Sequence, residues 1–396
     1  MPGSVIVSGA RTPVGRLMGA LSTVSAVDLG AHAIGAALAA APVDPAAVEA
    51  VVMGHVVQAG AGPNPARQAA IRAGIPFSVA ASTVNKLCLS GLHAIALADL
   101  MITSGRHEVV VAGGMESMSG APHLLRGARG GWRYGGGAVE DGLDRDALVC
   151  AFDQVSMGAA TERYQQPFGL TREEQDEYSA LSHRRAARAR ESGAWADEIA
   201  PYKVPGRHGG TVVDTDEGIR PDSTAESLGR LRPAFSDGGT VTAGNSSQLS
   251  DGGAAVVVMS AERARREGLA PLAEIGAYGT VAGPDPSLLV QPAGAVRDAL
   301  ARDGRLDAVD VDLFEINEAF AGVALASVRE LGLPLDRVNV NGGAIALGHP
   351  VGMTGARLVL TLAAELRRRG GGTGAAALCG GGGQGDALLL RVPAQA

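Results

Sequence analysis

Short apolar runs alternate with longer alanine-rich stretches along the first part of this chain. Runs of β-branched and other apolar residues at positions 5–7, 51–53 and 109–111 have the character of buried strands. Between them, residues 26–40 and 91–104 are alanine-rich stretches typical of helices. Strand and helix in alternation predict an α/β fold with a mostly parallel sheet that helices cover.

The pattern changes near residue 120 and returns near residue 250. Residues 126–137 are rich in glycine and arginine, residues 171–193 form a charged helical stretch, and a strand-like run over 254–260 restarts the alternation. A shared strand-then-glycine pattern at 109–114 and 375–381 favours two related halves. The expected divisions are an N-terminal half, an insertion, the completion of the first half and a C-terminal half: residues 1–119, 120–249, 250–270 and 271–396.

Composition limits the classes of protein to consider. The sequence has 396 residues, 46% of them hydrophobic, which is enough for a sizeable core in two or three units. A net charge of −7 gives no electrostatic reason to expect nucleic acid as a partner. No apolar run approaches the roughly 18 residues of a membrane span, and no leader-like segment opens the sequence. We therefore expect a cytoplasmic protein with neither nucleic acid nor a membrane as a partner.

The cysteines are few. Cys88, Cys150 and Cys379 make an odd set that does not form a disulfide framework, so free thiols remain for chemistry. Cys150 is expected only to pack. No Cys or His pair has the spacing of zinc ligands with a second pair to complete four, so no metal site is expected.

Two of the candidate residues suit nucleophilic catalysis. Cys88 stands where a β-prone stretch meets an apolar helical run, and a thiol at a helix N-terminus favours the thiolate form. His349 lies in a glycine-flanked loop, where an imidazole can remove a thiol proton and return it. Taken singly, each residue is more often structural, as a buried cysteine or a loop histidine.

Two further segments suit oxyanion chemistry. Cys379 ends an alanine-rich strand and begins a run of glycines, whose backbone N–H groups can converge on a developing oxyanion. A phosphate loop of the Walker type would need Gly-Lys-Ser/Thr, which the chain lacks. Asn317 follows a strand-like run over 313–316, where it could cap the next helix or orient a water as an oxyanion donor.

Taken together, the segments around Cys88, Asn317, His349 and Cys379 resemble the four catalytic motifs of the thiolase family. Further motifs follow in the family's order along nearly the whole chain: Gly9–Gly15, Gly113–Ser119, Leu231–Phe235 and Thr242–Ser247. An ordered set of motifs is far more specific than any one of them. The resemblance implies two similar βα halves in a five-layered αβαβα core with an inserted loop domain, which matches the change of pattern over 120–249.

The resemblance also implies an acyltransferase, and the closest likeness is to bacterial members that condense two acetyl-CoA molecules reversibly into acetoacetyl-CoA and CoA. In the family pattern, His349 activates Cys88, which carries the acyl group, and Cys379 removes the α-proton of the second acetyl-CoA. Asn317 would hold a water that, with His349, stabilises the thioester oxyanion. Backbone N–H groups of Cys88 and Gly381 would serve the tetrahedral intermediate.

The family pattern also implies positions for coenzyme A. Ser247 and Ala243 would lie beside the pantetheine arm, with Arg220 and Phe235 also near the cofactor, and Met157 would line the acyl pocket. Phe320 is expected to pack behind the catalytic asparagine. No cofactor would be bound permanently, because acyl-CoA and CoA are the substrates.

One departure from the family pattern and one loop bear on substrate and assembly. Many biosynthetic members carry His before the Met-Gly pair, whereas Ser156 precedes Met157 here, so substrate preference is less firmly implied than reaction type. Residues 126–137 resemble the family's tetramer-forming loop. The resemblance therefore implies a homotetramer, as a dimer of dimers, or a homodimer.

Three alternatives remain open from the sequence. A degradative 3-oxoacyl-CoA thiolase of fatty-acid β-oxidation would use the same residues on longer chains. A ketosynthase or hydroxymethylglutaryl-CoA synthase would share the fold and a cysteine nucleophile, but Cys379 in its glycine loop is the thiolase arrangement. A thiolase-like lipid-binding protein would have lost the nucleophile or the base, and here both are present.

Overall fold

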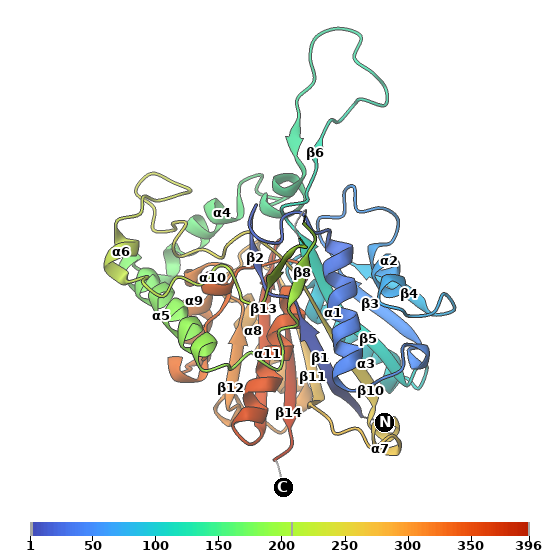
Figure 1. The fold of residues 1–396 in the computed structure, drawn as a ribbon. Coiled ribbons are helices and arrows are strands. Elements are labelled where there is room, and N and C mark those ends of the chain that lie inside the picture. Colours follow the sequence, from blue (N-terminus) through green and yellow to red (C-terminus); the bar gives the residue numbers. More distant parts are fainter. Residues whose placement is uncertain (1–2, 207–208, 395–396) are drawn as a thin grey trace.

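The computed structural model describes residues 3–206 and 209–394 (Figure 1). A ten-stranded sheet runs through the described chain, with β2 paired to β10 at its side. In spatial order its strands are β12 (Leu313–Ile316), β13 (Gly372–Gly380), β14 (Gln384–Val392), β11 (Ala273–Ala282), β1 (Ser4–Arg11), β10 (Ser250–Ser260), β5 (Val109–Ser117), β3 (Ala50–Gly54) and β4 (Ala80–Val84), with β2 (Gly15–Arg16). The strand runs predicted from the sequence lie within β1, β3, β5 and β10.

Strand direction differs from the prediction. Of the pairs in this sheet, β3 with β4, β3 with β5 and β12 with β13 are parallel, and the others are antiparallel. The prediction of a mostly parallel sheet is therefore wrong. Local periodicity identifies a strand but not its partner, and a tight turn over residues 381–383 joins β13 to β14 as a hairpin without any crossover helix.

Helices pack in three layers around the strands. Helices α1 (Ala26–Ala40) and α2 (Pro65–Arg72) cover the strands of the N-terminal half, and α8 (Gln291–Asp303), with α9 (Ala321–Leu331) against it, covers those of the C-terminal half. Helices α3 (Ser90–Thr103) and α11 (Thr354–Arg368) contact each other and strands of both halves. The predicted five-layered αβαβα core is confirmed. Among the described residues, the strands of the two halves are joined into one sheet by the short pairing of β1 with β11.

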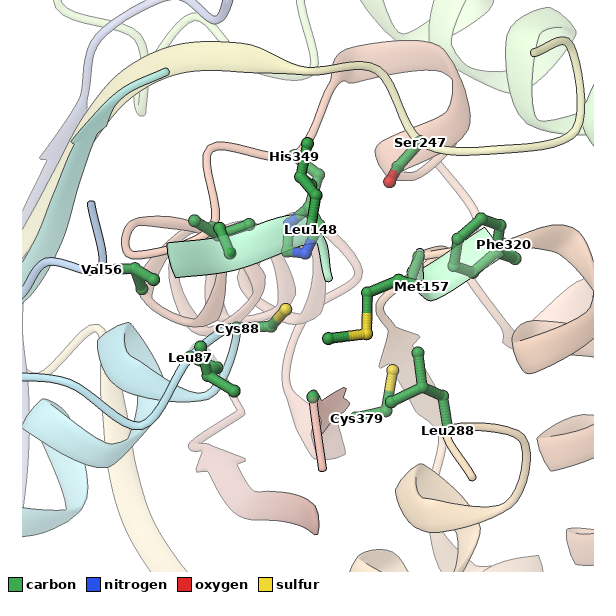
Figure 2. Close-up of a pocket in the computed structure, with 14 residues that line it drawn as sticks. Val56, Leu87, Cys88, Leu148, Met157, Ser247, Leu288, Phe320, His349 and Cys379 are labelled. Carbon is green, nitrogen blue, oxygen red and sulfur yellow. The ribbon is translucent and has the colours of Figure 1, made fainter. Parts of the chain in front are cut away.

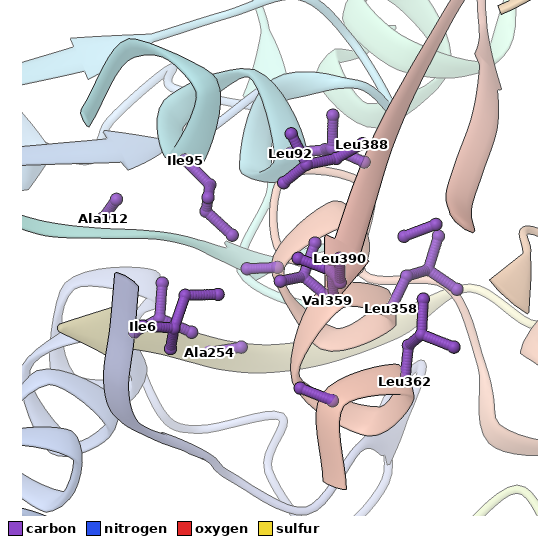
Figure 3. Packing of buried hydrophobic residues seen from close by; sticks show 14 of the residues in the cluster. Ile6, Leu92, Ile95, Ala112, Ala254, Leu358, Val359, Leu362, Leu388 and Leu390 are labelled. Carbon is purple, nitrogen blue, oxygen red and sulfur yellow. The ribbon is translucent and has the colours of Figure 1, made fainter. Parts of the chain in front are cut away.

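The centre of the molecule is apolar because α3 and α11 lie between the strands of the N-terminal half and those of the C-terminal half. Leu92 and Ile95 of α3 meet Leu358 and Leu362 of α11 in one buried cluster with side chains of both half-sheets (Figure 3). The two helices approach closely at Gly355, where an added Cβ would clash with the backbone of α3. This close packing fixes the helix starts, and the loops that carry Cys88 and His349 lie just before them.

The chain leaves the sheet between β5 and β10. This excursion contains α4 (Met157–Tyr164), α5 (Arg172–Glu191), α6 (Ala225–Gly229) and the hairpins β6 (His123–Leu124) with β7 (Glu140–Asp141) and β8 (Tyr202–Val204) with β9 (Thr211–Val213). Helix α5 matches the predicted charged helix and begins with a capping box of Thr171 and Glu174. The loop beyond β6 projects far from the body of the molecule (Figure 1).

Short helical segments complete the described chain. They are Pro45–Ala47, Asp144–Leu148, Gln166–Phe168, α7 (Ala261–Arg266), Ala308–Asp310, Leu335–Arg337 and α10 (Ala344–Leu347). Within residues 3–206 and 209–394, no helix has the length and apolarity needed to cross a membrane.

A buried ion cluster ties the excursion to the sheet. Arg11, at the end of β1, lies 2.7 Å from Oε1 of Glu198 and 2.7 Å from Oδ1 of Asp216, and all three side chains are buried. The carboxylates raise the pKa of the Arg11 guanidinium against the opposing effect of burial. The guanidinium therefore stays charged and holds two distant parts of the excursion against β1.

Candidate active site

One mostly apolar cavity collects side chains from the loops that precede α3 and α11, from the end of β13 and from the excursion (Figure 2). Cys88, His349, Cys379 and Gly381 all line it. The remaining lining residues are Val56, Leu87, Ala147, Leu148, Met157, Ser247, Leu288, Ala319, Phe320 and Val351. Residues nearly 300 positions apart in the sequence thus share a single space.

Cys88 lies in a tight turn just ahead of α3. Leu87 adopts a left-handed conformation with φ 52°, and the hydroxyl of Ser90 accepts from the backbone N–H of Lys86 and donates to the carbonyl of Leu87. This turn points the Cys88 sulfur into the cavity (Figure 2). A φ in this region is unusual for leucine, so the turn is held by its surroundings.

The expected preference of Cys88 for thiolate is wrong for the resting thiol. Burial raises the pKa of Cys88 to about 11, although the backbone N–H groups of Cys88 and Gly381 act in the opposite direction, and the charge of Glu116 adds to the rise. Desolvation outweighs the effect of the nearby helix start because the cavity wall is apolar. The thiol is therefore neutral near pH 7 and needs a base.

His349 is oriented by a hydroxyl. Its Nδ1 lies 2.7 Å from Oγ1 of Thr354, and this hydroxyl donates its proton to the carbonyl oxygen of Pro350 at 2.9 Å. Since the hydroxyl has one proton, Oγ1 accepts from Nδ1–H, and Nε2 is left unprotonated as an acceptor. Burial, with the charge of Arg357, lowers the pKa of His349 to about 3. The ring is therefore a neutral proton acceptor.

Asn317 faces this ring from the other side. Its Nδ2 lies 3.4 Å from Nε2 of His349, and the asparagine is fully buried between β12 and α9. The alternative that it caps the next helix is wrong, because Phe320 occupies the N-cap position of α9.

Cys379 is the second thiol in the cavity. It lies in β13, opposite Gly385 of β14, and is completely buried. Burial raises the pKa of the Cys379 thiol well above its usual range, and the neighbouring Cys88 adds to the rise. The two thiols are thus close enough to influence each other's charge. An added Cβ at Gly381, in the turn after β13, would meet the end of Met157, so only glycine fits there without displacing the cavity wall.

The positions expected near coenzyme A separate into two groups. Met157, Ser247 and Phe320 line the cavity, and the Ser247 hydroxyl points into it (Figure 2). Phe235 is exposed outside the cavity lining and lies edge-on to Phe320 with ring centroids 6.2 Å apart. Arg220 and Ala243 are likewise exposed and lie outside the cavity lining. The structure thus brings the expected acyl-end residues together and leaves Arg220, Phe235 and Ala243 on the surface.

Sequence reasoning missed several residues of the site. Leu148 and Leu288 form part of the apolar wall, and neither belongs to a motif that could have revealed it. Thr354 was missed although its place five residues after His349, at the start of a helix, is a local signal. His55 lies outside every motif named above, but it is buried with Nε2 3.2 Å from Oε1 of Glu116.

The described residues include no candidate metal site. Within residues 3–206 and 209–394, no group of three or more His, Cys, Asp or Glu side chains is arranged to hold a metal ion. Cys150 is buried away from the cavity lining. The chemistry available at the site is that of two thiols, an imidazole, an amide and backbone N–H groups.

Comparison with known proteins places the chain. The thiolase N-terminal domain family matches residues 4–262, and the thiolase C-terminal domain family matches residues 269–392. The chain belongs to the thiolase family. This thiolase is 56% identical over 388 residues to a Mycolicibacterium smegmatis protein named "Probable acetyl-CoA acetyltransferase", covering 98% of this chain and 100% of that protein.

Solved structures agree on the fold. The crystal structure of the Bacillus anthracis acetyl-CoA acetyltransferase matches this thiolase with a TM-score of 0.96 and 42% identity, covering 99% of both chains. The crystal structure of human mitochondrial 3-ketoacyl-CoA thiolase matches with a TM-score of 0.95 and 40% identity, again over 99% of both chains. Because the two differ in name but not in fold, the choice of substrate depends on the cavity.

Proposed function

We propose that this thiolase is an acetyl-CoA C-acetyltransferase, which condenses two acetyl-CoA molecules reversibly into acetoacetyl-CoA and CoA. The observation that carries the proposal is the single cavity shared by the thiols of Cys88 and Cys379 and the imidazole of His349. The names of the similar proteins from Mycolicibacterium smegmatis and Bacillus anthracis point to the same reaction.

The first half-reaction acylates Cys88. Nε2 of His349 takes the thiol proton as the sulfur attacks the thioester carbon of acetyl-CoA. Backbone N–H groups of Cys88 and Gly381 stabilise the oxyanion of the tetrahedral intermediate. Collapse of this intermediate breaks the bond to the CoA sulfur, which leaves as CoA with the proton, and acetyl-Cys88 remains.

The second half-reaction forms the carbon–carbon bond. Cys379 removes the α-proton of a second acetyl-CoA, and the resulting enolate attacks the acetyl carbon on Cys88. Asn317 holds a water beside His349 that donates to the thioester oxygen, where the enolate charge develops. Collapse of the tetrahedral intermediate breaks the carbon–sulfur bond to Cys88, whose sulfur takes the proton that Cys379 removed, and acetoacetyl-CoA leaves. The high pKa of Cys379 at rest requires that substrate binding stabilises its thiolate.

We propose that the pantetheine arm of coenzyme A runs from the cavity towards the protein surface. Ser247 and Ala243 lie beside the pantetheine, and Phe235 and Arg220 lie further out. Met157 and Phe320 enclose the acyl end. Acyl-CoA and CoA are substrates, so no permanently bound cofactor is required by this reaction.

Mass spectrometry after exposure to acetyl-CoA tests the proposal. We expect one acetyl group on Cys88, no acetyl group in Cys88→Ala, and ping-pong kinetics in both directions. An intact wild-type protein without an adduct would contradict the proposal and would favour the lipid-binding alternative.

A degradative 3-oxoacyl-CoA thiolase remains the second candidate, because the human mitochondrial neighbour carries that name. Leu148, Met157 and Leu288 lie in the apolar wall of the cavity, where their bulk would limit the length of the acyl chain. A panel of 3-oxoacyl-CoA substrates of increasing length decides between the two. Faster thiolysis of long chains than of acetoacetyl-CoA would select the second candidate, with a place in fatty-acid metabolism.

We also propose how the chain is organised and assembled. The divisions are the N-terminal thiolase half over 1–119, a loop domain for coenzyme A and assembly over 120–249, the completion of the first half over 250–270 and the C-terminal half over 271–396. The projecting loop exposes Trp132 and Tyr134, which suits a homotetramer built as a dimer of dimers. Light scattering before and after deletion of 126–137 distinguishes a tetramer from a homodimer. The three free thiols suit a cytoplasmic location.

A further inference from the structure

A second polar cluster lies beside the turn that carries the nucleophile. Its centre is Lys86, one of two lysines in the sequence, the other being Lys203. The ammonium group of Lys86 donates to Oδ1 of Asp386 at 2.7 Å and to the hydroxyls of Tyr278 and Thr280, each at 3.2 Å. The Asp386 side chain is fully buried and that of Lys86 is 20% exposed. This ion pair is therefore largely removed from water.

The pair connects the two halves of the molecule at the active site. Lys86 precedes Cys88 by two residues, in the turn where Leu87 is left-handed. Asp386 belongs to β14. Gly381, five residues earlier, lies in the turn that joins β13 to β14. The other acceptors of the Lys86 ammonium lie on β11, the neighbour of β14. A shift of Lys86 relative to β14 would therefore also shift Cys88 relative to Gly381.

We propose that Lys86 and Asp386 are positioning residues for acyl transfer, whose ion pair holds the N–H groups of Cys88 and Gly381 at the separation that the tetrahedral intermediate requires. The two N–H groups come from opposite halves and both act on the Cys88 sulfur. Preorganised donors lose most of their effect when misplaced by about 1 Å. This inference rests on the proposed function of Cys88 as the acylated nucleophile.

Removing one charge of the Lys86–Asp386 ion pair should have a different effect from removing both charges. Oδ2 of Asp386 is buried without a hydrogen-bond partner in the chain as described, and the Thr280 hydroxyl donates to the same Oδ1 as Lys86 does. Removing Lys86 alone leaves the buried carboxylate of Asp386 without its cation. This uncompensated charge destabilises the folded protein more than neutralising both partners does. The single and double variants should therefore differ in a recognisable way.

The test compares Lys86→Met, Asp386→Asn and the double variant with Lys203→Met as a matched control. Lys203 is exposed in β8, so its loss should leave the acylation rate unchanged. Acetylation of Cys88 is followed by rapid quenching and mass spectrometry over a range of acetyl-CoA concentrations. For Lys86→Met we expect the rate at saturation to fall about 10²-fold. The half-saturating concentration should change by less than about threefold, because substrate contacts are untouched.

The double variant distinguishes positioning from general destabilisation. We expect its rate to be no lower than that of the worse single variant, because both changes break one contact. If Lys86→Met does not fold, the acylation rate of the neutral double variant still tests the positioning role. A folded double variant that acylates within about twofold of the wild type would overturn the positioning role. Wild-type protein that gains no acetyl group would instead overturn the proposed function, so the two failures are distinguishable.

Discussion

Nδ1 of His349 lies 2.7 Å from Oγ1 of Thr354, and this contact decides which ring nitrogen faces Asn317 and the cavity. The Thr354 hydroxyl gives its own proton to Pro350, so it can only accept from the ring. The basic Nε2 is therefore directed into the cavity by a residue that lies on the first turn of α11.

Replacing this hydroxyl should slow acylation of Cys88. For Thr354→Val we expect the turnover rate to fall by about 10- to 100-fold, because the ring loses both its tautomer preference and its orientation. Thr354→Ser keeps the hydroxyl and should stay near the wild-type rate. Equal rates for the valine and serine variants would show that the hydroxyl does not orient the base.

The two thiols should separate the half-reactions. Cys379→Ala is expected to take an acetyl group from acetyl-CoA on Cys88 but to form no acetoacetyl-CoA, because only the second step needs its base. Cys88→Ala should do neither. The acetyl adduct is measured by mass spectrometry and the product by its absorbance. Equal loss of both half-reactions in Cys379→Ala would contradict this division of roles.

The pH dependence of alkylation should report the burial of Cys88. Because its pKa is raised to about 11, the thiolate fraction is small near neutrality and grows with pH. Site-specific alkylation by iodoacetamide should rise about tenfold per pH unit from roughly pH 7 to 10, whereas a free cysteine levels off near pH 9. A plateau for Cys88 below pH 8 would contradict the raised pKa.

The wall of the acyl pocket should set the chain length. Leu148→Ala removes apolar bulk from the cavity, so kcat/KM for a six-carbon 3-oxoacyl-CoA should rise about tenfold relative to acetoacetyl-CoA. Leu100→Ala is the matched control, since Leu100 is 62% exposed on α3. An unchanged substrate ratio would place the length limit elsewhere in the cavity.

The buried ion cluster at Arg11 should contribute strongly to the free energy of unfolding. Arg11→Met leaves Glu198 and Asp216 without their cation and should lower the free energy of unfolding by about 3–5 kcal/mol. Arg16→Met is the matched control, because Arg16 is half-exposed beside Glu217 and should cost less than about 1 kcal/mol. Urea unfolding measures both, and equal losses would show that burial does not matter here.

The sequence by itself determined the family, the elements and the candidate residues. Helices over 26–40 and 91–104 and the strand runs were predicted because their periodicity is local. Cys88, Asn317, His349 and Cys379 could be singled out because each lies in a short motif, and the order of the motifs along the chain is specific even when each motif is weak.

The tertiary structure alone decided the direction of the strands, the charge state of the thiols and the contacts that hold the site. The pairing of β13 with β14, the raised pKa of Cys88 and the contact of Lys86 with Asp386 each depend on residues or surroundings that a local pattern does not contain. Lys86 and Asp386 are 300 residues apart and carry no shared local signal. Periodicity encodes which face of an element is buried, whereas desolvation and long-range pairing exist only once the elements are packed.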